Sequence, residues 1–295
     1  MMYRKPSFIC IGAQKAGTSW LYNNLCKHPQ AAMLPLKELH YFDEIEMGLK
    51  TNLYNRLVDG HWRNKWWRTN FWQYFYSSCA TRNTTQLLWV LKYFLGKRSF
   101  EWYNSLFPDV AGKITGDFTP AYTILSENLV REIHRAFPHT KIILLLRDPV
   151  ERDWSQYKMV LKRTGKTELL LDKSNAYFNE IILEKGARSN YLHALNAWSA
   201  CYPAEQFFVG FYDSIQENPQ QLFNNICHFL AIDNYNTESA TEFVNKGMEK
   251  SADSDVMQIL AEKYKDDLVA LSNYFSKHPV NYPARWLQKY FGGNS

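Results

Sequence analysis

A short apolar run, a turn between two glycines and an amphipathic helix follow one another in Phe8–Leu21, FICIGAQKAGTSWL. Such a strand–loop–helix unit directs backbone N–H groups and the positive end of a helix dipole toward a bound anion. In the triphosphate-binding loop G-x-x-x-x-G-K-[ST] a lysine follows the second glycine, whereas here Thr18 has that place and the lysine is Lys15. The unit predicts a cradle for a terminal phosphate or sulfate. An ordinary strand–turn–helix connection is the alternative.

Further strands and helices alternate along the chain. The run Lys141–Leu146, KIILLL, is continuously apolar, as expected of a central parallel strand covered on both faces. Helices are predicted at 126–137, 150–162, 219–230 and 254–275, and a third strand at 206–212. This order predicts an α/β fold in which a central parallel sheet is flanked by helices, with residues 1–295 forming a single domain.

The segment 47–97 interrupts this alternation and is predicted to be an insertion within the domain. It combines aromatic side chains with interleaved basic residues, including Arg63, Lys65 and Arg68. A helical hairpin whose aromatic residues pack on the main body is one interpretation; a substrate lid and a patch for peripheral membrane contact are the others. The aromatic residues are Trp62, Trp66, Trp67, Phe71, Trp72, Tyr74, Phe75, Tyr76 and Trp89.

Composition limits the classes of function. A net charge of +5 over 295 residues is compatible with anionic small molecules and too small to indicate nucleic acid. The five cysteines form no C-x-x-C pair and lie near no histidine at metal-ligand spacing, so we expect reduced thiols and no metal site. The N-terminus shows no secretion signal, which leads us to expect a cytoplasmic protein. The number of subunits is left open.

A second anion-binding position is predicted where the run Lys141–Leu146 ends. Arg147 follows the strand directly, and Ser155 lies two turns into the next helix. In an open parallel sheet the ligand crevice lies at the carboxyl edge, so both side chains are expected to approach the loop that contains Lys15. A structural Arg–Asp ion pair is the alternative. Two anion positions together suggest a ligand with phosphates at two places.

At this point the sequence resembles the sulfotransferase superfamily that uses 3′-phosphoadenosine 5′-phosphosulfate (PAPS), in its bacterial and heparan-sulfate-type carbohydrate branch. The resemblance rests on four motifs in order: Lys15–Ser19 (KAGTS), Lys37–Asp43 (KELHYFD), Gly116–Tyr122 (GDFTPAY) and 146–157 (LRDPVERDWSQY). It continues more loosely through 185–198 (KGARSNYLHALNAW) and 245–247 (NKG).

The resemblance implies a P-loop-like sulfotransferase fold, PAPS as donor, adenosine 3′,5′-bisphosphate as product and no metal. It assigns the first loop to the 5′-phosphosulfate and Arg147 with Ser155 to the 3′-phosphate. The residues expected to bind the nucleotide are Lys15, Ala16, Gly17, Thr18, Ser19, Trp20, Arg147, Ser155, Tyr191, Lys246 and Gly247.

Catalysis of sulfuryl transfer needs neutralisation of the leaving phosphate and removal of the acceptor proton. Lys15 is expected to supply the cation. Glu38 matches the position of the general base in the heparan-type branch, and His40, two residues later, is its alternative or helper.

The acceptor is expected to be a hydroxyl group. Where heparan-type enzymes place a lysine before Thr-Pro, this chain has Phe118, so we expect Phe118 and Tyr122 to face the acceptor. An aromatic wall favours a sugar face, a phenol or a lipid-linked headgroup over a strongly anionic polysaccharide.

Two other classes of function compete with this interpretation. A P-loop kinase dependent on a nucleoside triphosphate shares the cradle but requires the lysine after the second glycine, where Thr18 stands. A non-catalytic nucleotide-binding or membrane-binding module would not need Lys15, Glu38, Arg147 and Ser155 together.

Overall fold

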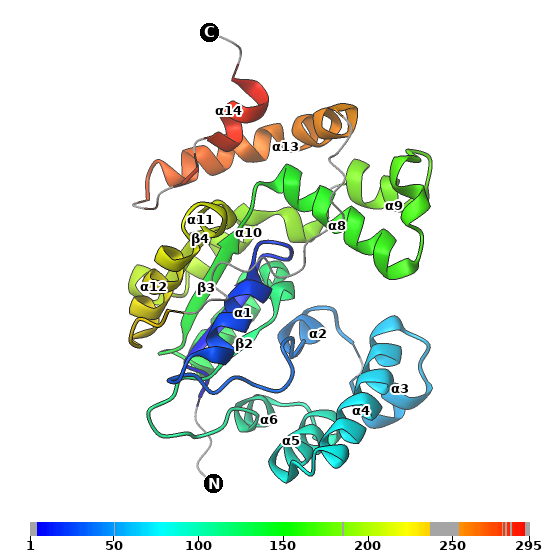
Figure 1. Ribbon diagram of the computed structural model, residues 1–295, viewed down its shortest axis with the longest axis vertical. Coiled ribbons are helices and arrows are strands. Elements are labelled where there is room, and N and C mark those ends of the chain that lie inside the picture. The colour runs from blue at the N-terminus through cyan, green and yellow to red at the C-terminus, as the bar shows by residue number, and fades with distance from the viewer. Residues whose placement is uncertain are drawn as a thin grey trace.

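A computed structural model describes residues 5–49, 51–184, 186–236, 254–278, 280, 282–283 and 285–292. Its centre is a sheet of four parallel strands in the order β2-β1-β3-β4. The strands are β1 (Phe8–Gly12), β2 (Gly116–Phe118), β3 (Lys141–Leu146) and β4 (Phe207–Phe211). Helices flank this sheet (Figure 1), which confirms the predicted fold class.

The two central strands are the most buried part of the molecule. Every residue from Phe8 to Ile11 and from Ile142 to Leu146 is inaccessible to solvent. The register pairs Phe8 with Lys141 on one side and with Gly116 on the other. Continuous apolar runs therefore form β1 and β3 because both faces of these strands are covered. β2 was not predicted, since three residues are too few to show a periodicity.

The helices of the main body begin at recognisable caps. The Ser126 side chain accepts a hydrogen bond from the Leu129 amide at the start of α7. Asp148 caps α8, which ends at Gly165 in the left-handed conformation (φ +70°), and Asn218 caps α12. These bounds agree with the predicted helices to within two residues. The helices of the main body are α1 (Thr18–Lys27), α2 (Phe42–Glu46), α6 (Phe100–Ser105), α7 (Glu127–Ala136), α8 (Pro149–Thr164), α10 (Tyr191–Ser199), α11 (Tyr212–Glu217) and α12 (Pro219–Leu230).

Short helical turns and two C-terminal helices complete the described chain. In Figure 1, α13 and α14 lie together at the end of the molecule opposite α5 and α6. These elements are η1 (Pro120–Ile124), η2 (Thr167–Leu171), α9 (Ala176–Phe178), η3 (Asn179–Leu183), η4 (Ala187–Ser189), η5 (Ala204–Gln206), α13 (Ser254–Phe275) and α14 (Arg285–Phe291).

The segment 47–97 contributes three helices: α3 (Leu53–Val58), α4 (Trp62–Ala80) and α5 (Thr84–Leu95). They form a group to one side of the sheet, in blue to cyan in Figure 1. α4 packs against α5, where Trp67 and Phe94 meet edge to face with ring centroids 5.6 Å apart. Two buried ion pairs, Arg56–Glu44 at 2.6 Å and Arg63–Asp43 at 2.5 Å, tie α3 and α4 to α2.

Among the residues that the structure describes, no helix combines the length and the apolar character needed to cross a bilayer. All five cysteines are free thiols.

Candidate active site

The loop between β1 and α1 adopts a backbone that glycine makes possible. Gly17, the N-cap of α1, has φ +96°, and a Cβ there would lie 2.3 Å from Ile215 Cδ1. Lys15 is also left-handed, with φ +67°. Within the described residues no side chain caps α1, so the N-terminus of this ten-residue helix suits an anionic ligand.

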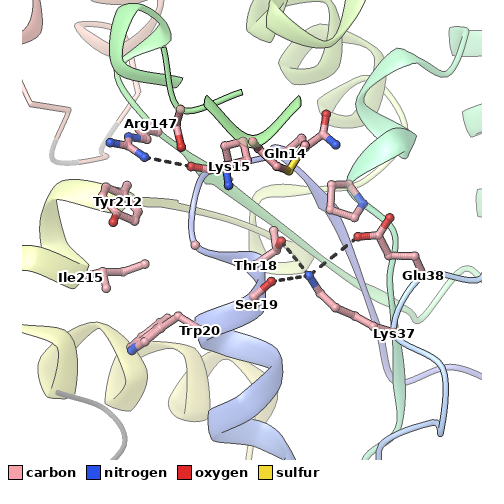
Figure 2. A pocket seen from close by; sticks show the side chains of 14 residues that line it. Gln14, Lys15, Thr18, Ser19, Trp20, Lys37, Glu38, Arg147, Tyr212 and Ile215 are labelled. Carbon is pink, nitrogen blue, oxygen red and sulfur yellow. Dashed lines mark hydrogen bonds and ion pairs between the residues drawn. The ribbon is translucent and has the colours of Figure 1, made fainter. Parts of the chain in front are cut away.

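A pocket of about 190 Å³ opens in front of this loop. It lies at the carboxyl ends of β1 and β3, where the direction of chain progression reverses, which is the usual ligand position in an open parallel sheet. Its lining comes from separate parts of the chain: Gln14, Lys15, Gly17, Thr18, Ser19, Trp20, Lys37, Glu38, Pro120, Arg147, Ser155, Met159, Tyr212 and Ile215. Figure 2 shows the labelled side chains around it.

Lys15 presents a cation to this pocket. Its ammonium group has no hydrogen-bond or ion-pair partner among the described residues. Burial lowers the pKa of Lys15, and the nearby charges of Arg147, Lys158 and Lys37 lower it further. A bound anion would relieve both effects, so the electrostatics favour a negatively charged ligand at this point.

Lys37, which was not among the predicted site residues, lies on the other side of the α1 N-terminus. Its Nζ donates to Ser19 Oγ at 2.8 Å and to Thr18 Oγ1 at 3.4 Å, and it lies 3.8 Å from Glu38 Oε1 (Figure 2). Burial lowers the pKa of Lys37 against the opposing effect of Glu38. Its position beside Glu38 in the motif KELHYFD was the available signal.

Arg147 is held at the pocket by three contacts. Its Nη1 donates to the Lys15 carbonyl at 3.4 Å, its Nη2 lies 3.2 Å from Glu151 Oε2, and its guanidinium stacks 4.3 Å from the centre of the Tyr212 ring. Ser155, from α8, lines the same pocket. The two residues predicted to meet at a second anion position are thus brought to one pocket together with Lys15.

Glu38 belongs to a chain of charged groups that leads out of the pocket. Glu38 Oε2 lies 3.1 Å from His40 Nε2, and His40 Nδ1 lies 3.0 Å from Asp43 Oδ2. Asp43 in turn accepts a hydrogen bond of 2.5 Å from Arg63 of α4. We call Glu38, His40, Asp43 and Arg63 the relay.

The relay fixes the charge of its members. Burial alone would lower the pKa of His40, but hydrogen bonds to Asp43 and Glu38 outweigh it and raise the pKa to about 9. For Glu38, burial raises the pKa, yet the hydrogen bond and charge of His40 leave it below its usual value. Near neutral pH the relay therefore holds an imidazolium between two carboxylates, so His40 is not available to accept a proton.

Several predicted site residues lie outside the pocket. Phe118 is fully buried and packs edge to face on Phe8 and Tyr22, with ring centroids 5.4 and 5.5 Å apart. Tyr122 is also fully buried, and its hydroxyl accepts a hydrogen bond from the Tyr41 amide. The prediction that these two residues face an acceptor is wrong, because both side chains belong to the core.

Other predicted residues act indirectly or cannot be placed. The Ala16 amide donates to the Ala13 carbonyl, which leaves no N–H at Ala16 for a phosphate. Tyr191 is buried and donates its hydroxyl to the Arg147 carbonyl at 3.0 Å, so it positions Arg147 from behind. Lys246 and Gly247 lie outside the residues that the structure describes.

Comparison with known proteins points to one family. The model described as "Sulfotransferase family" matches residues 6–236. The Dictyostelium discoideum protein named "Membrane-associated sulfotransferase kil1" is 32% identical over 152 residues, which are 52% of this chain and 22% of that protein. The human "Heparan sulfate glucosamine 3-O-sulfotransferase 6" is 41% identical over 69 residues, 23% of this chain and 20% of that protein. This chain thus spans about a fifth of the length of either curated relative.

A solved structure has a similar fold along nearly the whole chain. The crystal structure of a sulfotransferase from Alicyclobacillus acidocaldarius aligns with a TM-score of 0.61 and covers 96% of this chain and 99% of its own. At 20% sequence identity this likeness concerns the fold alone.

Proposed function

Because the chain belongs to the sulfotransferase family, we propose that it transfers the sulfuryl group of PAPS to a hydroxyl group of an acceptor molecule. The observation that carries the proposal is the Lys15 ammonium, which has no partner among the described residues and lines one pocket with the uncapped start of α1 and with Glu38. A phosphosulfate needs the cation and the amides, and the acceptor needs the carboxylate.

The donor would bind at both of its phosphate ends. Lys15 and the first amides of α1 suit the 5′-phosphosulfate, since a helix N-terminus and a cation stabilise the same negative charge. Arg147 and Ser155 suit the 3′-phosphate, because a guanidinium and a hydroxyl can donate to different oxygens of one phosphate. PAPS supplies the activated sulfur, and the residues supply position and charge.

Lys15 and Lys37 would stabilise negative charge on different groups of the donor. In an in-line displacement the acceptor oxygen bonds to sulfur while the bond from sulfur to the phosphate oxygen breaks, and the electron pair of that bond stays on the 5′-phosphate. Lys15 would stabilise this leaving phosphate. Lys37, between the α1 hydroxyls and Glu38, would face the sulfonate oxygens in transit.

Glu38 is the proposed general base, with His40 as its positioning residue. The proton of the acceptor hydroxyl passes to the Glu38 carboxylate, which lines the pocket. His40 is protonated and bonded to carboxylates at both ring nitrogens, so it orients Glu38. In this proposal Glu38 accepts the proton and His40 only holds Glu38 in place.

The acceptor we favour is a carbohydrate hydroxyl. Curated relatives are named for heparan sulfate modification, and a half-buried aromatic ring, Trp66, lies edge-on to His40 with ring centroids 6.0 Å apart. A ring beside the base suits the apolar face of a sugar. A phenol or a lipid-linked headgroup is the other acceptor class that such a ring admits.

The proposal is tested by transfer of labelled sulfate from PAPS to a panel of glycans, phenols and glycolipids. Glu38→Gln should abolish transfer and keep nucleotide binding, whereas Lys15→Ala and Arg147→Ala should weaken binding. Glu180→Gln, at an exposed carboxylate of η3, is the matched control and should transfer at the parent rate. Transfer by Glu38→Gln at the parent rate would overturn the base assignment.

Binding separates this proposal from a kinase. Adenosine 3′,5′-bisphosphate without metal should raise the thermal midpoint of the parent protein, since at about 100 times its Kd a ligand stabilises by about 2.7 kcal/mol. Stabilisation by ATP with Mg²⁺ in its place would favour the kinase and contradict PAPS as donor.

A further inference from the structure

The insertion presents an apolar face for which the sulfuryl-transfer proposal has no use. The exposed positions of α4 recur at helical spacing and form one stripe, of which Trp62 is 58%, Trp72 52% and Tyr76 63% exposed. α3 adds further exposed apolar side chains beside it. We call this set the docking surface; its members are Leu53, Tyr54, Leu57, Val58, Trp62, Lys65, Thr69, Trp72 and Tyr76.

The helices that form the docking surface, α3 and α4, are bonded to each other. Arg68 of α4 donates to the carbonyls of Arg56, Leu57 and Asp59, which fixes the end of α3 beside α4. The opposite side of α4 is buried, with Trp67 against Phe94. The outward aromatic rings are therefore held out by a packed helix pair.

Charge identifies the kind of partner. From residue 60 to residue 100 the sequence contains seven Lys or Arg residues and no Asp or Glu. Lys65, Arg82 and Lys97 are exposed. The preceding acid, Asp59, accepts a hydrogen bond from the His61 amide. A partner that covers the docking surface thus meets aromatic rings and positive charge, which an anionic partner complements.

We propose that the docking surface binds the headgroup region of a membrane rich in anionic lipids. Trp and Tyr rings have an apolar body and a polar tip, and they concentrate where headgroups meet acyl chains. Lysine and arginine beside them gain from the negative surface potential of such a membrane. A second copy of this chain is disfavoured, because a symmetric contact would bring together two copies of the same basic stretch, which contains no carboxylate to offset the repulsion.

The contact is peripheral. Helix α4 has one side buried on the protein, at Arg63 and Trp67, and one side exposed, at Trp72 and Tyr76, so only its exposed side would meet the lipid. Its inner side carries Arg63, which is the relay member bonded to Asp43, and Trp66, which contacts His40. The same helix thus connects the lipid contact to the base, and the proposal does not depend on which acceptor is sulfated.

Flotation with lipid vesicles tests the proposal without donor or acceptor. The full chain is mixed with vesicles of phosphatidylcholine plus phosphatidylserine, and separately with vesicles of phosphatidylcholine alone. We expect co-flotation with the mixed vesicles that weakens as salt is added, and little with the neutral ones. Failure to bind the mixed vesicles at low salt would overturn the proposal.

Variants locate the contact. Trp72→Ser with Tyr76→Ser should lower the partition coefficient at least about tenfold. Lys65→Ala should lower it about fivefold on the mixed vesicles only. Leu171→Ser with Leu183→Ser, which replaces side chains that are 66% and 51% exposed outside the insertion, is the matched control and should bind like the parent.

Two further outcomes would contradict the proposal. Parent-level binding by the Trp72 and Tyr76 double variant would place the contact elsewhere. If size-exclusion chromatography shows a parent dimer that the double variant converts to a monomer, the surface is an interface between copies. If the double variant melts at a lower temperature than the parent, Lys65→Glu replaces it as the test of whether the docking surface binds the vesicles. This substitution is exposed and leaves the aromatic packing in place.

Discussion

Lys15 has a left-handed backbone, φ +67°, that a residue with a Cβ rarely adopts. Such a conformation costs about 1 kcal/mol or more and persists only where the surroundings impose it. Here the Arg147 guanidinium holds the Lys15 carbonyl, and Gly17 allows the chain to enter α1. The cation is therefore in place before a ligand arrives, and binding needs little further ordering of the loop.

The charge of His40 makes a prediction for stability against pH. The pKa of His40 is about 9 in the folded protein and about 6.5 in an unfolded chain. Its contribution to the free energy of unfolding is therefore complete below about pH 6.5 and is lost as the pH rises through about 9. The difference in unfolding free energy between the parent and His40→Gln should therefore shrink as the pH rises from about 6.5 through about 9. Urea unfolding at several pH values would measure it.

His139→Gln, at an exposed histidine, serves as the control and should follow the parent at every pH. A gap between His40→Gln and the parent that stays constant from pH 6 to pH 10 would contradict a protonated His40.

At the scale of single residues, position follows from sequence where a motif fixes the backbone and not where packing decides, and the roles of the pocket residues remain a prediction. Lys15, Arg147 and Ser155 reach one pocket because the carboxyl ends of β1 and β3 are adjacent. Phe118 turned inward because β2 pairs with β1 and places its ring between Phe8 and Tyr22. Which face of so short a strand is covered depends on that pairing, and the sequence alone does not contain it.

Among the helices, α4 has one exposed side and one buried side, and both carry aromatic residues. Trp72 and Tyr76 face outward, while Arg63 and Trp67 are buried. Aromatic residues on both sides hide the periodicity by which an amphipathic helix is recognised, so the sequence left a hairpin, a lid and a membrane patch open. The helical pair α4–α5 is now observed, and the single-domain boundaries remain a prediction.

Arg63 gives a prediction for turnover that belongs to this helix. Arg63→Met removes the cation behind Asp43, so His40 and Glu38 should lose their fixed orientation. We expect kcat to fall, by up to about 100-fold if the carboxylate moves by an ångström, and the Kd of adenosine 3′,5′-bisphosphate to stay unchanged. Steady-state kinetics with nucleotide titration separates the two quantities, and Arg63→Lys should restore part of the rate.

Arg68→Met is the matched control on α4, because Arg68 donates hydrogen bonds to carbonyls at the end of α3 and, among the described residues, to no member of the relay. An equal loss of kcat in both variants would mean that the insertion acts by its general stability and that Arg63 has no positioning role.

Across the whole molecule, a buried ionic cluster holds helix α13 to the main body. Asp153 of α8 accepts hydrogen bonds from Lys263 at 2.7 Å and from Tyr264 at 2.5 Å, both in α13. Arg152 and Ser189 complete the cluster. Because α8 also carries Ser155, the docking of α13 supports the helix that forms one wall of the pocket.

Asp153→Ala should therefore destabilise the protein. Removal of one member of a buried charged cluster leaves its partners without compensation and costs about 3 kcal/mol of unfolding free energy. Asp255→Ala removes an exposed carboxylate that pairs with Lys173 and should cost under about 1 kcal/mol. Chemical denaturation of both variants measures the difference, and equal losses would contradict a role for Asp153 in fastening α13.

In the strand order β2-β1-β3-β4, residues 13–115 connect β1 to β2, the strand that lies directly beside it. Lys15 and Arg147 follow β1 and β3, and the pairing of these two strands involves no residue of 47–97. A chimera that receives residues 47–97 from a relative should keep its affinity for the nucleotide. Its acceptor preference should be that of the relative. We therefore expect acceptor specificity to be exchangeable together with residues 47–97, which transfer assays on the chimera would measure.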